Sequence, residues 1–125
     1  MKKKILVVDD DRYLRELYIE ILLEAGYDVD AVGDGQEAVS KLQIGGYALT
    51  LLDMIMPKID GLGVLAAAAK LSPPIENGPI LVLTNLSHDP VIQEATNRGA
   101  QGYLIKTDLT PKEIIQTVKK FLNED

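Results

Sequence analysis

The fold is decided by a short apolar run that ends in acidic residues, Ile5-Leu6-Val7-Val8-Asp9-Asp10-Asp11. Four β-prone apolar residues in succession predict a strand that is buried on both faces. Apolar residues then recur at helical spacing from Leu14 to Leu22, and Ala25-Gly26 is typical of a helix end. The run therefore opens a strand-then-helix unit with acids at the junction.

The same unit is repeated along the chain. Further strands are expected at 27–32, 47–52, 80–83 and 102–105, and further helices at 35–44, 62–71, 90–98 and 111–122. Five alternating units predict a parallel sheet with helices on both faces. We expect a single domain over residues 1–125, an α/β, doubly wound (βα)5 sandwich with a five-stranded parallel sheet and flavodoxin-like topology.

Composition argues against several classes of function. The 125-residue chain has a net charge of −6 and no cysteine. Direct nucleic-acid binding needs clustered Lys and Arg, which a chain of this charge does not favour. Without cysteine there are no disulfides and no thiolate metal sites. Because no apolar run approaches the roughly 20 residues of a membrane span, we expect a cytoplasmic protein without membrane contact.

Polar residues follow four of the expected strands. They are Asp9 and Asp10, Asp53, Thr84 and Lys106. Parallel strands place their carboxyl ends at one edge of the sheet, where ligands of open α/β folds bind. Three carboxylates, one hydroxyl and one ammonium group are therefore expected to converge there.

Each of these residues also has a simpler interpretation. Acids after a strand are common helix N-caps, and Asp11 fits that role. Thr84 on its own could be a strand-end hydroxyl, and Lys106 a solvated charge. Asp53 is not followed by a helical pattern, so capping does not explain it. The five residues together indicate a site more strongly than any one alone.

Clustered carboxylates repel one another unless a cation neutralises them. Ligation by oxygen alone suits Mg²⁺ or Mn²⁺ better than zinc. A divalent ion and Lys106 would together supply positive charge to receive a phosphoryl group, and such transfer depends mainly on positioning and charge neutralisation. The residues thus predict phosphoryl chemistry at a carboxylate.

The chain resembles the receiver domain of bacterial two-component response regulators, and is similar to chemotaxis regulators. The resemblance rests on four segments: Val7-Val8-Asp9-Asp10-Asp11, Leu51 to Pro57 with Asp60-Gly61, Val82-Leu83-Thr84, and Gly102 to Lys106. It implies that Asp53 is the phosphoacceptor and that Thr84 and Lys106 bind the phosphoryl oxygens.

The resemblance also implies a metal set and a switch. Asp10, Asp53 and the backbone carbonyl of Ile55 would ligate the metal directly, with Asp9 supporting through water. Tyr103 would move inward when Thr84 shifts toward the phosphate. The output surface would then be the fourth helix, fifth strand and fifth helix.

Two positions depart from the family pattern. Asn85 stands where a small residue usually follows the threonine, and Thr107 stands where proline usually follows the lysine. A cis bond to a non-proline costs about 2.5–4 kcal/mol, so a trans bond is expected between Lys106 and Thr107. Asn85 and Met54 are expected to modulate access to Asp53.

Partners and alternative functions follow from the resemblance. The expected partners are a sensor histidine kinase or phosphotransfer protein and a downstream target or effector domain, with the chain a monomer or weak phosphorylation-dependent dimer. It would not be an enzyme beyond catalysing its own phosphorylation and dephosphorylation. One alternative is a phosphorylation-independent, receiver-like interaction module. Another is an aspartyl-nucleophile phosphatase, which the acids after the first strand would fit but which leaves Asp53 unexplained.

Overall fold

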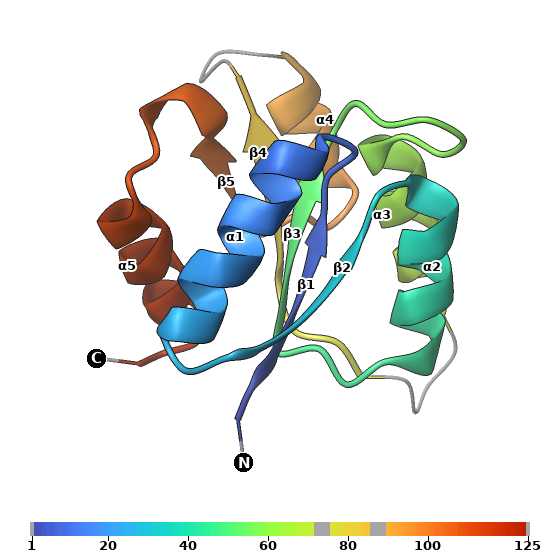
Figure 1. Cartoon of the computed structure of the whole chain (residues 1–125). Helices are drawn as coiled ribbons and strands as arrows, with labels where there is room; N and C mark the ends of the chain where they lie inside the picture. The colour runs from blue at the N-terminus through green and yellow to red at the C-terminus, as the bar shows by residue number, and fades with distance from the viewer. Residues whose placement is uncertain (1, 72–75, 86–89, 125) are drawn as a thin grey trace.

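The computed structural model describes residues 2–71, 76–85 and 90–124, in which strands and helices alternate (Figure 1). The elements are β1 Lys4–Val8, α1 Arg12–Glu24, β2 Asp28–Val32, α2 Gly35–Ile44, β3 Leu49–Asp53, α3 Gly61–Ala69, β4 Ile80–Thr84, α4 Pro90–Asn97, β5 Gly102–Ile105, a 3-10 turn Lys106–Asp108 and α5 Pro111–Phe121. Within these ranges no helix is both long and apolar enough to cross a membrane.

The strands form one parallel sheet in the order β2-β1-β3-β4-β5. Val8 of β1 lies opposite Leu52 of β3, so the acids that follow β1 come next to Asp53. Asp53 in turn lies opposite Leu83 of β4. The expected doubly wound α/β fold is confirmed, and its register brings the polar strand ends to one edge.

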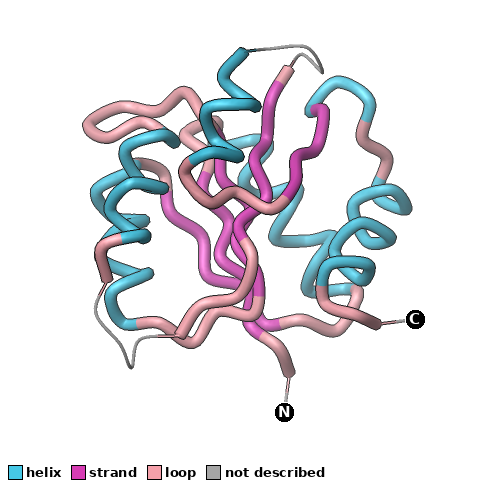
Figure 2. Tube along the Cα trace, turned by 180° about the vertical axis from the view of Figure 1, so that it is seen from behind, coloured by secondary structure: helices cyan, strands magenta, loops and turns pink. Residues whose placement is uncertain are grey.

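Helices cover both faces of the sheet. In Figure 1, α1 and α5 lie on one side and α2, α3 and α4 on the other, and Figure 2 shows the same layers from behind. Each side has its own core: Leu6, Leu52 and Val64 belong to the α2–α4 side, and Ile5 and Leu51 to the α1–α5 side. Successive strand residues point to opposite faces, so strands buried on both sides must be apolar throughout.

Helix starts follow the expected capping chemistry. The Asp11 carboxylate accepts a hydrogen bond from Leu14 N, which confirms its assignment as the N-cap of α1. Thr110 caps α5 in the same way by accepting from Glu113 N. Asp and Thr side chains at these positions satisfy N–H groups that have no partner within the helix.

Two expected boundaries differ from the structure by two residues, and several others differ by one. Tyr47 was included in the third strand, but β3 begins at Leu49. The Tyr47 carbonyl accepts from Gly78 N and its N–H donates to Asn77 Oδ1, so its backbone pairs with a loop. The third helix ends at Ala69, short of the expected Leu71, because the last amide groups bond three residues back in a tightened turn.

Candidate functional site

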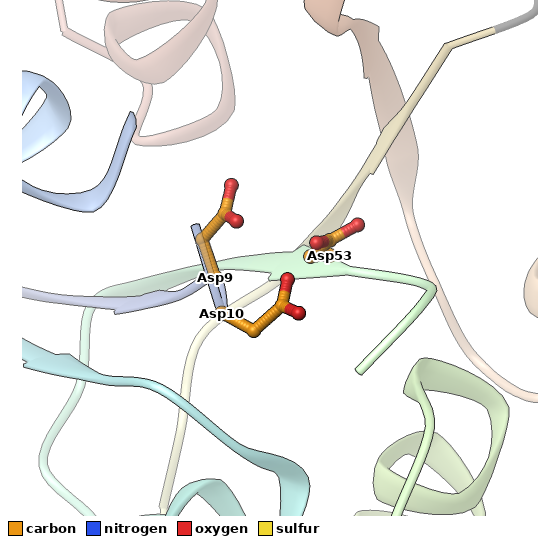
Figure 3. A group of neighbouring side chains, drawn as sticks. All are labelled: Asp9, Asp10 and Asp53. Atoms are coloured by element: carbon orange, nitrogen blue, oxygen red, sulfur yellow. The ribbon is translucent and has the colours of Figure 1, made fainter. Parts of the chain in front are cut away.

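Three aspartates form an acidic cluster at the carboxyl edge of the sheet (Figure 3). Asp9 and Asp10 follow β1, and Asp53 ends β3. Each offers one carboxylate oxygen, and these oxygens lie within 4.8 Å of one another. Asp9 is fully buried and Asp53 is 7% exposed, whereas Asp10 faces solvent. The sequence-based expectation that these carboxylates converge agrees with this geometry.

Asp9 is held at several of its atoms. Its N–H donates to Val32 O at 3.2 Å, and its Oδ1 accepts from Asp11 N at 3.0 Å. Its backbone carbonyl accepts from Arg15 Nη1 at 2.8 Å. The acidic turn, residues 9–11, is therefore hydrogen-bonded to β2 on one side and to α1 on the other.

Lys106 lies between two of the carboxylates. Its Nζ is 3.1 Å from Asp9 Oδ2 and 3.1 Å from Asp53 Oδ2. Burial alone lowers the pKa of Lys106, but Asp53 and Asp9 outweigh it and the pKa lies above its usual value. Lys106 is therefore a charged ammonium group at neutral pH and partly neutralises the cluster.

Two other groups at the cluster also have raised pKa values. Burial raises the pKa of the Asp53 carboxyl to about 6; Lys106 opposes this rise and Asp9 adds to it. Burial and then Asp9 raise the pKa of the Tyr18 phenol in α1 to about 12. Charge on Asp53 is thus less favourable than on a free carboxyl group, and a bound cation would favour it.

A hollow of about 450 Å³ opens beside Asp53 on the α4 side of the sheet. Its lining includes Thr84, Lys106, Asn85 and Met54. Thr84 is buried at the end of β4, while Asn85 is exposed at the rim. The structure thus brings the expected hydroxyl and ammonium groups, and both expected modulating residues, to the space in front of Asp53.

Two other expected site residues lie at the periphery. The Ile55 N–H donates to Asp53 Oδ1 at 3.4 Å, and its side chain is 81% exposed. Tyr103 is in β5, opposite Val82 of β4, and its side chain is 45% exposed. Ile55 therefore belongs to the turn that follows Asp53, whereas Tyr103 is partly exposed on β5, the edge strand of the sheet.

Comparison with known proteins identifies the family. The sequence model of the response regulator receiver domain family matches residues 5–119 of this chain. The chain belongs to the response regulator receiver domain family. This membership confirms the resemblance inferred from the strand-end motifs.

Relatives of this receiver domain share both sequence and fold. Chemotaxis protein CheY of Thermotoga maritima is 27% identical over 121 residues, covering 96% of this chain and 98% of CheY. Transcriptional regulatory protein PdtaR of Mycobacterium tuberculosis is 36% identical over 114 residues, covering 87% of this chain and 54% of PdtaR. A CheY-like receiver domain protein from Methanospirillum hungatei superposes with a TM-score of 0.87 at 27% identity, over 98% of this chain and 95% of that one.

The receiver domain spans about half the length of several curated relatives that it matches, as the PdtaR comparison shows. The activity and partners of such longer proteins are not transferred to this chain by the match. What the family establishes is a domain of two-component signalling pathways.

The residues of this receiver domain fit a hard divalent cation. Asp9 Oδ2 is shielded from solvent and, among the described residues, receives no hydrogen bond of good geometry, although Lys106 lies beside it. Asp10 has a solvent-facing carboxylate next to two buried ones. An all-oxygen donor set of this kind suits Mg²⁺ or Mn²⁺.

Sequence reasoning did not single out Arg15, which binds Asp9, or Tyr18, whose pKa the charges of the site affect. Arg15 binds the Asp9 carbonyl, but its position in the sequence is that of an ordinary polar residue on a helix surface. Tyr18 occupies a buried apolar position of α1, four residues after Leu14 and three before Ile21, so helical spacing could have placed it in the core. No feature of the sequence shows its hydroxyl near the aspartates.

Proposed function

We propose that this domain receives a phosphoryl group on Asp53 from a histidine kinase or phosphotransfer protein. The observation that carries the proposal is the place of the Asp53 carboxylate, between the acids of β1 and the ammonium group of Lys106 and open to the hollow in front. Scaffolding does not account for three clustered carboxylates, two of them buried, at a place where burial and the nearby Asp9 raise the pKa of Asp53.

The proposed cofactor is Mg²⁺, with Mn²⁺ as a substitute. Asp10 and Asp53 would hold it directly with the Ile55 carbonyl, and Asp9 would support it through water. The bound ion would neutralise carboxylate repulsion and charge on the transferring phosphoryl oxygens.

The transfer itself uses Asp53 as nucleophile. One Asp53 oxygen forms a bond to phosphorus while the phosphorus–nitrogen bond of the donor phosphohistidine breaks and the imidazole retains the electron pair. Lys106 and Thr84 would each hold a phosphoryl oxygen, since both line the hollow beside Asp53. Positioned cationic and hydroxyl donors of this kind stabilise the charge that develops on those oxygens.

The proposed output is a change of the α4-β5-α5 surface. A phosphate carries a charge of about −2 and would draw Thr84 toward it. Thr84 of β4 lies opposite Ile105, two residues beyond Tyr103 in β5, so a shift at Thr84 occurs next to the strand that carries the aromatic ring. Tyr103 would then move inward and alter the surface offered to a downstream target or effector domain.

Other properties of the proposed function stay predictions. The domain would catalyse only its own phosphorylation and hydrolysis, would not bind nucleic acid directly, and would work in the cytoplasm as a monomer or weak dimer. A receiver-like interaction module that needs no phosphate is the competing function.

Acetyl phosphate with Mg²⁺ tests the proposal. Mass spectrometry should show a gain of one phosphoryl group, absent in Asp53→Asn and retained in Asp28→Asn, a matched change at an exposed aspartate of β2. No mass gain in the wild-type domain with acetyl phosphate or a phosphorylated kinase domain would favour the interaction module. A gain that persists in Asp53→Asn would move the acceptor to another residue.

A further inference from the structure

Arg15 spans the space between α1 and the end of β2. Its Nη1 donates to the Asp9 carbonyl at 2.8 Å. Its guanidinium also fills the position that a side chain at Gly33 would take: a Cβ built there would lie 2.9 Å from Nη1 and 3.6 Å from Cζ. The absence of a side chain at residue 33 therefore allows Arg15 to reach the acidic turn.

The carbonyl that Arg15 binds belongs to the peptide group joining Asp9 to Asp10. The N–H and the carboxylate of Asp9 are held by other groups, so Arg15 is what fixes the orientation of this peptide plane. Among the described residues, none donates a hydrogen bond to the Asp10 carboxylate. Its direction is therefore set mainly by the backbone that Arg15 holds.

We propose that Arg15, seated over Gly33, is a positioning residue that sets metal affinity by holding the Asp9–Asp10 peptide plane and so aiming the Asp10 carboxylate. The inference rests on the proposed metal site. Its chemistry is that of an outer-shell hydrogen bond, and losing such a partner typically weakens metal affinity about 10–100-fold.

Arg15→Met gives a direct test, because positioning and charge predict opposite results. Removing a cation near the site would by itself strengthen Mg²⁺ binding. Loss of the hydrogen bond to Asp9 should instead weaken Mg²⁺ affinity by about tenfold. Arg12→Met is the matched control, since Arg12 is on the same helix but pairs with Glu16 in solvent. Mg²⁺ affinity is measured by calorimetric titration of the folded domain.

Gly33→Ala tests the same contact without changing charge. Gly33 lies outside the left-handed region of φ, so alanine fits the backbone, and the added methyl group meets only the flexible end of Arg15 among its nearest neighbours. Displacing the guanidinium should weaken Mg²⁺ binding in the wild-type background and have no further effect in Arg15→Met. This non-additivity would identify the shared contact.

A second measurement, in metal-free protein, separates this inference from the proposed function. The backbone amide resonance of Asp10, in the peptide group that Arg15 holds, should shift in both variants and not in Arg12→Met. If the wild type binds no Mg²⁺, the proposed metal site fails and the role of Arg15 in affinity fails with it, whatever the amide shows. If the wild type binds Mg²⁺ but Arg15→Met binds it equally well or better, the proposed metal site stands and the positioning role is overturned.

Discussion

The Lys106 ammonium nitrogen lies 3.1 Å from Asp53 Oδ2 while the same nitrogen lies equally close to Asp9. Lys106 is thus the internal counter-ion of two buried carboxylates. A bound divalent ion would share this role, so the stability of the domain and the occupancy of its site are expected to depend on each other.

Replacing Lys106 tests this dependence. Lys106→Met leaves two buried carboxylates without their partner, and breaking a buried pair costs about 3–5 kcal/mol. We expect a loss of this order in urea unfolding without metal, and substantial recovery in excess Mg²⁺. Lys112→Met, at an exposed position of α5, should leave the free energy of unfolding unchanged.

Lys106→Met should also bind Mg²⁺ yet fail to couple phosphorylation to output. A normal output response in this variant would show that Lys106 does not have that role.

Asp53 gives a pH-dependent prediction for the metal-free domain. Burial raises the pKa of Asp53 from 3.8 to about 6. Between these values the folded state keeps a proton that the unfolded chain has released, so stability falls as the pH rises through this window. Asp53→Asn should therefore be more stable than the wild type at pH 7, by roughly 3 kcal/mol, and lose this advantage near pH 3. Denaturant unfolding at both pH values measures it, and an equal difference at both would contradict the assignment.

Mg²⁺ should stabilise the domain through the same cluster. An ion that binds only the folded state at 100 times its Kd adds about 2.7 kcal/mol. We expect Asp10→Asn to lose most of this gain while keeping its stability in chelator, because Asp10 is exposed and its carboxylate accepts no hydrogen bond from the described residues. Thermal unfolding with Mg²⁺ and with chelator measures both quantities, and Asp28→Asn, which should retain the full gain, controls for surface charge.

Tyr103 should become less accessible on phosphorylation. Its side chain is 45% exposed, and that of Tyr13 in α1 is 73% exposed. With fluorotyrosine incorporated, the ¹⁹F signal of Tyr103 should lose solvent contact when acetyl phosphate and Mg²⁺ are added, while Tyr13 serves as internal reference. Tyr103→Phe assigns the signal. Unchanged exposure of Tyr103 in the phosphorylated domain would rule out the aromatic switch.

Much of the fold could be predicted from the sequence because its strands are continuous apolar blocks. The expected bounds of α2 and β5 agree with the structure. The predicted start of β3 was wrong because Tyr47 is as buried as a strand residue. Its hydroxyl donates to Asp30, and its backbone pairs with a loop. An apolar pattern reports burial, and burial does not distinguish a strand from a loop packed beneath it.

The residues of the site could be predicted from the sequence for a different reason. Parallel strands bring their carboxyl ends together, so Asp9, Asp53 and Lys106 could be grouped without knowing any distance. The contact of Arg15 with Asp9 could not be inferred in this way, because it depends on the rotation of α1 and on the space left at Gly33. The raised pKa of Asp53 likewise depends on the depth of burial, which spacing alone does not reveal.

The site draws its acids from β1 and β3 and its lysine from the residue after β5, so its parts are spread over nearly the whole chain. During synthesis, Asp53 emerges about fifty residues before Lys106, the lysine that accompanies it. A nascent or truncated chain without β5 therefore presents Asp53 without the lysine that follows β5. The order of the strands thus makes the pairing of Asp53 with Lys106 a property of the finished sheet, which a chain shortened before β5 would lack.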